Sequence, residues 1–258
     1  MKKSLLIIGM GLIILSLTIS GCTEKENTNA SIHAYVGAGM QQPMDEIGKE
    51  FEKKYNIKVN YDYAGSGPLY SKILASNKGD IYMPGAYFYV SELSKKGYII
   101  EYSNITKHIP VIVVEKGNPK NITSLEDLGK PGVKLSLGEE NIAIGRTFNK
   151  ILTKAEKDYP GITQKIKNNT VVRGATVKQT LLYVELGQAD AAVVWRADAL
   201  SSDKVEIIQI NPKYNIIKTV PIAILNTTEN KENAKLFYDF VNTEGKEIFK
   251  KYGFEVIE

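Results

Sequence analysis

The sequence of 258 residues contains one cysteine, two histidines and one tryptophan. A single cysteine cannot form a disulfide within the chain, so a small disulfide-stabilised scaffold is excluded. Two histidines and one cysteine are also too few for a zinc finger or a multi-histidine metal site. We therefore expect no metal ion and no cofactor. We interpret His33 and His108 as structural, because neither has a cysteine or a helically spaced histidine nearby.

An excess of charge of one sign is also missing. The chain has 33 Lys and Arg against 29 Asp and Glu, a formal net charge of +4. Without residues 1–22, in which Lys2 and Lys3 are the only charged residues, the balance is 31 against 29. No window has the clustered basic side chains typical of a nucleic-acid-binding protein, so we expect no nucleic-acid partner. The 43% hydrophobic and 24% charged residues are typical of a globular protein.

The one long apolar run lies at the N-terminus, from Leu5 to Ile19, and follows two lysines. This order is typical of an export signal, and the run is shorter than the ~20 residues that a membrane-spanning helix needs. It ends in Ile19-Ser20-Gly21-Cys22, which resembles the lipobox of bacterial lipoproteins. The sequence therefore predicts a lipoprotein signal peptide over 1–22, lipidation of Cys22 and a polar tether over 23–30. The protein is then anchored outside the cytoplasmic membrane by lipid alone.

From Ser31 onward, patterns of strand and helix alternate. Short apolar runs predict strands, and apolar residues spaced three or four apart predict helices. The expected strands are 32–36, 58–63, 81–83, 109–114, 133–137, 171–172, 191–195, 205–210 and 220–225. The expected helices begin near Pro43 and Pro68 or cover 90–96, 147–157, 177–186, 232–241 and 244–252, and Thr176 can cap the helix over 177–186. This order predicts an α/β protein with mostly parallel sheets, whose ligands bind beyond the carboxyl ends of the strands.

Two glycine-rich loops, Gly37–Gly39 and Gly65–Gly67, each lie between a predicted strand and a helix that begins with proline. A helix N-terminus has unpaired backbone N–H groups and a partial positive charge, and glycine lets a ligand approach that backbone closely. Ser66 adds a hydroxyl donor. The loops could thus bind an anion without Lys or Arg, or the glycines could only turn the chain. Neither loop matches a P-loop or a dinucleotide-binding fingerprint.

The order of these motifs resembles the periplasmic molybdate-binding proteins of ABC importers, the molybdate/tungstate branch of the class II solute-binding fold. The resemblance runs from about Ile32 to the C-terminus. It is carried by YVGAGMQQPMDEIGKEF, YDYAGSGPLYSKI, KLSLGEENIAIGRTFNKIL, VKQTLLYVELGQADAAVVW and EIFKKYGFEVI. It implies a two-lobed periplasmic-binding-protein-like fold with a hinge and a ligand cleft between the lobes. Lobe 1 would comprise 31–108 and 220–258, and lobe 2 would comprise 109–219.

The resemblance also implies five ligand-binding positions. Ser66 matches a serine of the family, and the backbone amides of Ile144 and Val177 match two further donors. Two positions depart from the family pattern, because Gly39 stands where the family has serine and Trp195 where it has tyrosine. A hydroxyl is missing at both positions, although the indole N–H of Trp195 can still donate a hydrogen bond.

The implied function is non-enzymatic capture of molybdate or tungstate by a monomer, which delivers the anion to an ABC transporter permease. Another oxoanion, sulfate or phosphate, is the first alternative, because the same N–H donors would serve any of them. Ferric iron is less favoured, since no two tyrosines are adjacent. A catalytic relative is less favoured too, because the pattern G-x-S-x-G is absent around Ser66. We interpret Glu139-Glu140, Arg146, Arg173 and Arg196 as solvated or ion-paired.

Replacing Cys22 with serine is expected to leave the protein unlipidated, because the acyl chains are attached to the thiol at the end of the lipobox. In detergent–water phase partitioning, the wild-type protein should enter the detergent phase, whereas Cys22→Ser should be released or remain uncleaved. Ligand affinity should not change, since the folded part begins near Ser31. A wild-type protein found in the aqueous phase with a free Cys22 thiol would contradict the assignment.

Overall fold

The computed structural model describes residues 31–258, so the predicted signal peptide, the tether and Cys22 lie outside the described residues. The first sheet has the strand order β11-β4-β10-β3-β1-β2. Its strands are β1 (Ser31–Gly37), β2 (Lys58–Ala64), β3 (Ile81–Met83), β4 (Ile99–His108), β10 (Lys218–Leu225) and β11 (Glu255–Val256). The second sheet has the order β7-β6-β8-β5-β9. It contains β5 (Pro110–Glu115), β6 (Leu135–Gly138), β7 (Thr170–Gly174), β8 (Ala191–Trp195) and β9 (Val205–Gln209).

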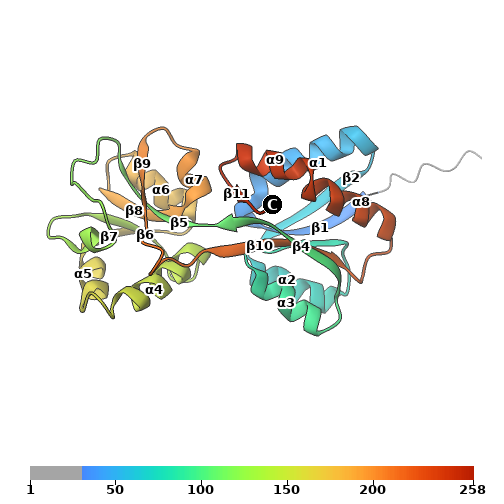
Figure 1. The fold of residues 1–258 in the computed structure, drawn as a ribbon, viewed down its shortest axis with the longest axis horizontal. Helices are drawn as coiled ribbons and strands as arrows, with labels where there is room; N and C mark the ends of the chain where they lie inside the picture. Colours follow the sequence, from blue (N-terminus) through green and yellow to red (C-terminus); the bar gives the residue numbers. More distant parts are fainter. Residues whose placement is uncertain (1–30) are drawn as a thin grey trace, which may run out of the picture.

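Each sheet carries its own helices, which confirms the predicted two-lobed α/β architecture (Figure 1). The first lobe contains α1 (Gln41–Tyr55), α2 (Ser66–Ser76), α3 (Tyr87–Lys95), α8 (Lys231–Asn242), α9 (Glu244–Lys251) and the 3-10 turn η1 (Ala38–Met40). The second lobe contains α4 (Ala143–Ala155), α5 (Ile162–Asn169), α6 (Val177–Glu185), α7 (Arg196–Leu200) and η2 (Glu126–Gly129). Within residues 31–258, no helix is both long and apolar enough to span a membrane.

The prediction of mostly parallel sheets was wrong, because both sheets are mixed. β1 pairs in parallel with β2 and β3, and β6 pairs in parallel with β7 and β8. In contrast, β10 is antiparallel to β3 and β4, and β5 is antiparallel to β8 and β9. The reason is the route of the chain. It leaves the first sheet along β4, enters the second along β5 and returns along β10, so the outgoing and returning strands run in opposite directions.

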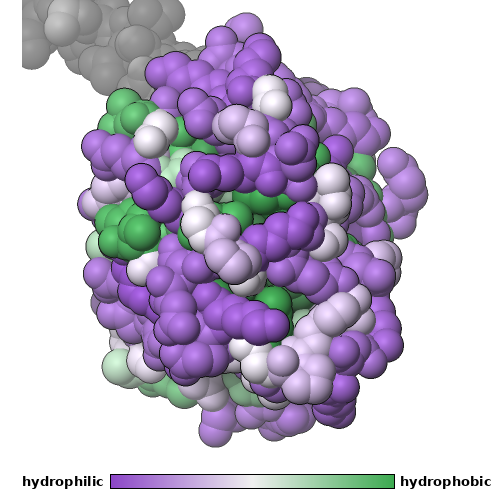
Figure 2. All heavy atoms as spheres, turned by 90° about the vertical axis from the view of Figure 1, so that its left-hand side faces the viewer, coloured by the Kyte–Doolittle hydropathy of each residue, from purple (hydrophilic) through white to green (hydrophobic). Residues whose placement is uncertain are grey.

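Each sheet is buried on both faces, since alternate residues of a strand point to opposite sides. In β1, Ala34 and Val36 pack in the cluster that holds residues of α1, α8 and α9, whereas Tyr35 packs with residues of α2 and α3. In β5, Ile112 and Val114 join the residues of α4 and α5, and Val111 and Val113 join those of α6. Each lobe therefore has a core of its own. Hydrophilic side chains cover most of the outer end of the second lobe (Figure 2).

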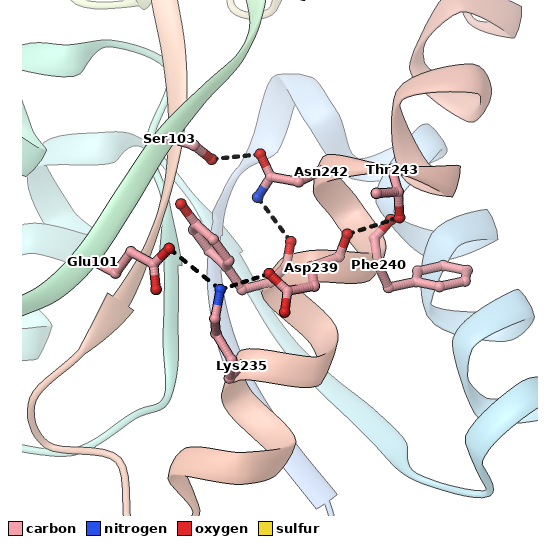
Figure 3. A network of polar contacts seen from close by, with 8 residues as sticks. Glu101, Ser103, Lys235, Asp239, Phe240, Asn242 and Thr243 are labelled. Carbon is pink, nitrogen blue, oxygen red and sulfur yellow. Dashed lines mark hydrogen bonds and ion pairs between the residues drawn. The ribbon is translucent and has the colours of Figure 1, made fainter.

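The C-terminal helices complete the first lobe, although they follow the whole second lobe in the sequence. Lys235 Nζ of α8 donates to Glu101 of β4 at 3.3 Å and to Asp239 at 2.7 Å (Figure 3). Ser103 Oγ of β4 donates to Asn242 Oδ1 at 2.6 Å (Figure 3). The exposed ion pairs contribute little stability each. Together with the Ser103–Asn242 hydrogen bond, they place α8 beside β4, the strand that leads to the second lobe.

Local signals account for several element boundaries. The predicted cap of α6 is confirmed, because Thr176 Oγ1 accepts the N–H of Gln179 at 3.1 Å. The apolar spacing of α4 is also confirmed, since Ile144, Phe148 and Ile151 are all buried. The predicted helices do not include α5 or α7, which have only eight and five residues. The predicted strands do not include β4, because most of its first half is exposed and it therefore lacks an apolar run.

Replacing Gly145 with alanine is expected to lower the free energy of unfolding by about 1–3 kcal/mol, the usual cost of overpacking. A Cβ at Gly145 would lie 2.0 Å from the carbonyl oxygen of Glu139, so the first turn of α4 would have to move. Gly67→Ala is the matched control in the first turn of α2, where the nearest atom would be 3.4 Å away. Chemical denaturation measures both. Equal stability of the two variants would contradict the close packing of α4.

Candidate ligand site between the lobes

Loops at the carboxyl ends of the parallel strands lie together in each lobe. In the first lobe, the register Gly37↔Ala64 and Val36↔Met83 brings the loops after β1, β2 and β3 to one edge of the sheet. In the second lobe, the register Gly138↔Gly174 does the same for the loops after β6 and β7. Helices α2, α4 and α6 begin at these loops. Their first-turn N–H groups, which have no partner within the helix, are available to an anion.

Ser66, predicted as a ligand-binding residue, is the first residue of α2 and is partly buried. Its Oγ accepts the backbone N–H of Gly85 at 2.9 Å, and its carbonyl oxygen accepts the hydroxyl of Tyr82 at 2.9 Å. These bonds join the loop after β3 to the start of α2. Because Ser66 Oγ accepts from Gly85, the hydroxyl proton of Ser66 is left to donate to a ligand.

His108 occupies the centre of this region and is only 5% exposed. Its Nε2 lies 3.2 Å from Met40 Sδ, and its ring centroid lies 5.0 Å from that of Trp195 in the other lobe. A Cβ at Gly39 would be 3.3 Å from His108 Cε1, and a Cβ at Gly85 would be 3.5 Å from His108 Nε2. Gly39 and Gly85 of the first lobe therefore lie against the imidazole, which in turn contacts the second lobe.

The three second-lobe residues predicted as ligand-binding lie in one apolar cluster. Ile144 is buried in the first turn of α4, and Trp195, at the end of β8, is 6% exposed. Val177, the first residue of α6, is partly buried and packs against the same cluster. The structure thus places Gly39 beside His108 and Ser66 beside Gly85, and it groups Ile144 and Val177 with Trp195. The His108–Trp195 contact joins the two groups. Their role in binding a ligand stays a prediction.

Lys218 lies next to Trp195 and to Thr147 of α4, although neither Lys218 nor Thr147 is among the ligand-binding residues predicted from the sequence. Lys218, the first residue of β10, donates from Nζ to Thr147 Oγ1 at 2.5 Å, and its Nζ lies 5.3 Å from the centroid of Trp195. Thr147 is buried, and its hydroxyl donates to the carbonyl oxygen of Ala143 at 2.7 Å. Nothing in the sequence distinguishes Lys218 from the other basic residues, because its position depends on the pairing of distant strands.

Two of these side chains have pKa values well below their ordinary range. Burial lowers the pKa of His108 to about 4, and the positive charge of Lys218 adds to this effect. Partial burial lowers the pKa of Lys218 to about 8, and the charges of Lys150 and Arg146 add to it. At neutral pH the site therefore holds an uncharged imidazole beside a positively charged ammonium group.

The remaining candidates lie outside this group or contact the backbone. His33 Nε2 lies 3.0 Å from Asp62 Oδ2, as suits a structural residue. Arg173 donates to the carbonyl oxygen of Gly138 at 3.1 Å, and Arg196 donates to that of Gly253 at 3.2 Å. Arg146 donates to the carbonyl oxygen of Asn141. Among the residues that the structure describes, no group of three or more His, Cys, Asp or Glu side chains could hold a metal ion.

Comparisons with known proteins give this site a context. The profile described as "Bacterial extracellular solute-binding protein" matches residues 32–255. A putative binding protein of Haemophilus influenzae is 30% identical over 87% of this chain and 91% of its own length. The putative ABC transporter substrate-binding lipoprotein YvgL of Bacillus subtilis is 29% identical over 92% of this chain and 93% of its own length. The molybdate-binding protein ModA of Mycobacterium tuberculosis is 28% identical over 87% of this chain and 84% of its own length.

Solved structures agree with the expected periplasmic-binding-protein-like fold. The substrate binding domain of a putative molybdenum ABC transporter from Clostridium difficile has a TM-score of 0.74 at 22% identity, over 89% of this chain and 100% of that one. The sulfate-binding protein SubI of Mycobacterium tuberculosis has a TM-score of 0.71 at 16% identity, over 89% of this chain and 88% of that one. At these identities the likeness concerns the fold.

Acidification is expected to destabilise the protein through His108. As the pH falls from 6.5 to about 4, the unfolded chain takes up a proton at His108 but the folded protein does not. The free energy of unfolding should therefore fall by about 3 kcal/mol over this window. The variant His108→Gln should lack this loss when both proteins are denatured chemically at several pH values.

Comparison with the variant is needed because partial burial raises the pKa of Asp198 to about 6. In the same window the folded protein takes up that proton before the unfolded chain does, which raises stability as the pH falls. Asp198 is present in both proteins, so its contribution cancels in the difference. Parallel pH curves for wild type and His108→Gln between pH 7 and 4.5 would contradict the assignment.

Proposed function

We propose, from the premise that this chain belongs to the bacterial extracellular solute-binding protein family, that it captures molybdate or tungstate between its lobes and delivers the anion to an ABC transporter permease. The family consists of solute-binding proteins for transport, so binding and release, without catalysis, account for the site. The likeness to a relative named molybdate-binding protein supports the choice of ligand.

The observation that carries the proposal is that α2, α4 and α6 all begin in loops that follow the carboxyl ends of parallel strands, with uncharged donors in their first turns. Ser66 offers a hydroxyl and a first-turn amide, and the amides of Ile144 and Val177 begin α4 and α6. A tetrahedral oxoanion needs several N–H and O–H donors from different directions, and helix N-termini supply them together with a favourable dipole. Trp195 adds its indole N–H from the second lobe.

Sulfate or phosphate is the second candidate ligand. A sulfate-binding protein shares the fold, so the fold alone does not choose among oxoanions. The same donors would bind each of these anions, and the size of the cavity would then decide between them. The larger molybdate and tungstate ions are the primary choice because the ModA relative is 28% identical to this chain, whereas the sulfate-binding protein of Salmonella typhimurium is 23% identical.

We further propose that lobe 1, residues 31–108 and 220–258, and lobe 2, residues 109–219, close on the ligand as hinged binding proteins do. The hinge would be formed by the two segments that cross between the lobes, at about 106–112 and about 214–221. The protein acts as a monomer at the outer face of the cytoplasmic membrane, held there by lipid on Cys22. The relative from Bacillus subtilis is named a lipoprotein, which supports the anchor.

The direct experiment is thermal unfolding with molybdate, tungstate, sulfate and phosphate, each added separately as the sodium salt. A ligand that binds only the folded state raises the melting temperature with its concentration. We expect molybdate and tungstate to give the largest shifts. The fluorescence of Trp195, the only tryptophan, should change saturably with the same two anions. A panel in which no anion raises the melting temperature would overturn the proposal.

Replacing Ser66 with alanine is expected to weaken molybdate binding by roughly 1.5–3 kcal/mol, or roughly 10- to 150-fold, because a hydrogen bond to a charged group is lost. Titration calorimetry measures this change. Ser71→Ala is the matched control, since Ser71 is an exposed residue of the same helix. If Ser66→Ala binds within about twofold of Ser71→Ala, Ser66 is only a turn residue.

A further inference from the structure

The two strands that cross between the lobes remain paired up to the hinge. Lys218 of β10 lies opposite His108 of β4 in this antiparallel pair. Directly opposed residues of an antiparallel pair project to the same face of the sheet. Lys218 therefore lies on the same side as the imidazole, against which Gly39 and Gly85 lie, and its side chain extends to the second lobe.

The end of this side chain reaches the start of α4. Its Nζ donates to the buried Thr147 Oγ1 at 2.5 Å and lies 5.3 Å from the ring centroid of Trp195. Thr147 is one turn beyond Ala143, the first residue of α4, so the ammonium group lies near the N-terminal end of that helix. One cation thus lies among residues from the hinge, from α4 and from the end of β8.

Within the part of the chain that the structure describes, no negative charge compensates this cation. Among residues 31–258, no carboxylate oxygen lies within 4.0 Å of Lys218 Nζ, and the charged groups that act on it, Arg146 and Lys150 of α4, are also positive. The other groups facing it are the uncharged His108 of β4 and Trp195 of β8. The N-terminus of α4 adds a partial positive charge. An uncompensated, partly buried cation costs stability, and an anion bound beside it would remove that cost.

We propose that Lys218 is the counter-ion of the bound ligand and makes the site selective for anions. This inference rests on the proposed oxoanion function and adds a charged residue to a site otherwise built from uncharged donors. Lys218 is then a specificity-determining residue: it favours anions over neutral solutes and cations. Because it belongs to the hinge strand, the same contact links the ligand to the segment about which the lobes would close.

A counter-ion role for Lys218 makes the affinity for the ligand depend on pH. The ammonium group of Lys218 loses its proton near pH 8 in the free protein, and a bound dianion would raise this pKa. Affinity should therefore be constant below about pH 8 and should fall as the pH rises above it, because binding then requires uptake of a proton. His108, with a pKa of about 4, stays uncharged throughout this range.

The test is calorimetric titration of the whole folded protein with sodium molybdate at pH 7.0 and pH 9.5. We expect Lys218→Met to bind at least tenfold more weakly than wild type at pH 7.0, and Lys218→Arg, which keeps the charge, to bind more tightly than Lys218→Met. Lys150→Met removes a charge from an exposed position of α4 and should stay within threefold of wild type. Wild type should weaken at least threefold at pH 9.5, and Lys218→Met should not.

The melting temperature of each ligand-free variant separates a binding role from a structural one. Lys218→Met should melt at the same temperature as wild type or higher, because an uncompensated cation has been removed. The inference is overturned if Lys218→Met binds within threefold of wild type, if Lys150→Met loses as much affinity, or if wild-type affinity is equal at both pH values. The proposed function survives those outcomes, whereas failure of the wild type to bind any oxoanion overturns both proposals.

Discussion

The pairing of β4 with β10 is the interaction on which the rest of the structure depends. These two strands carry the chain out of the first sheet and back into it, and they stay hydrogen-bonded to the register of Lys218 with His108. Next to this pair, the N–H of Arg196 donates to the carbonyl oxygen of Ile109 at 2.8 Å, and Asn215 Nδ2 donates to that of Pro110 at 3.0 Å. The hinge is therefore a short ribbon with defined geometry, and both side chains at its end contact the second lobe, His108 at Trp195 and Lys218 at Thr147.

This ribbon also explains the electrostatics of the site. His108 is held between Met40, Phe254 and Trp195, where its burial favours the uncharged imidazole. Lys218 on the neighbouring strand keeps its charge at neutral pH and makes protonation of the imidazole still less favourable. Two basic residues can thus share a confined region, because only one of them is charged. The arrangement leaves one partly buried positive charge, that of Lys218, among uncharged hydrogen-bond donors, with the exposed Arg146 and Lys150 of α4 nearby.

The glycines of the first lobe have a role beyond the turning of the chain. A side chain at Gly39 or Gly85 would occupy the space next to His108, since a Cβ there would lie 3.3 or 3.5 Å from the ring. His108 lies some 70 positions after Gly39 in the sequence, and only the folded chain brings its imidazole alongside this loop.

Local patterns were enough to determine the α/β alternation, the strands over Ile81–Met83 and Ala191–Trp195, and the Thr176 cap, because each depends on residues close together in the sequence. The glycine loop with Ser66 at a helix start was predictable for the same reason. The mixed direction of the sheets was not, because strand direction depends on where the chain crosses between lobes. Only the tertiary structure placed His108, Gly85, Thr147 and Lys218 together. These four residues lie far apart in the sequence. They meet because β4 and β10 pair in one register, and no local propensity encodes that register.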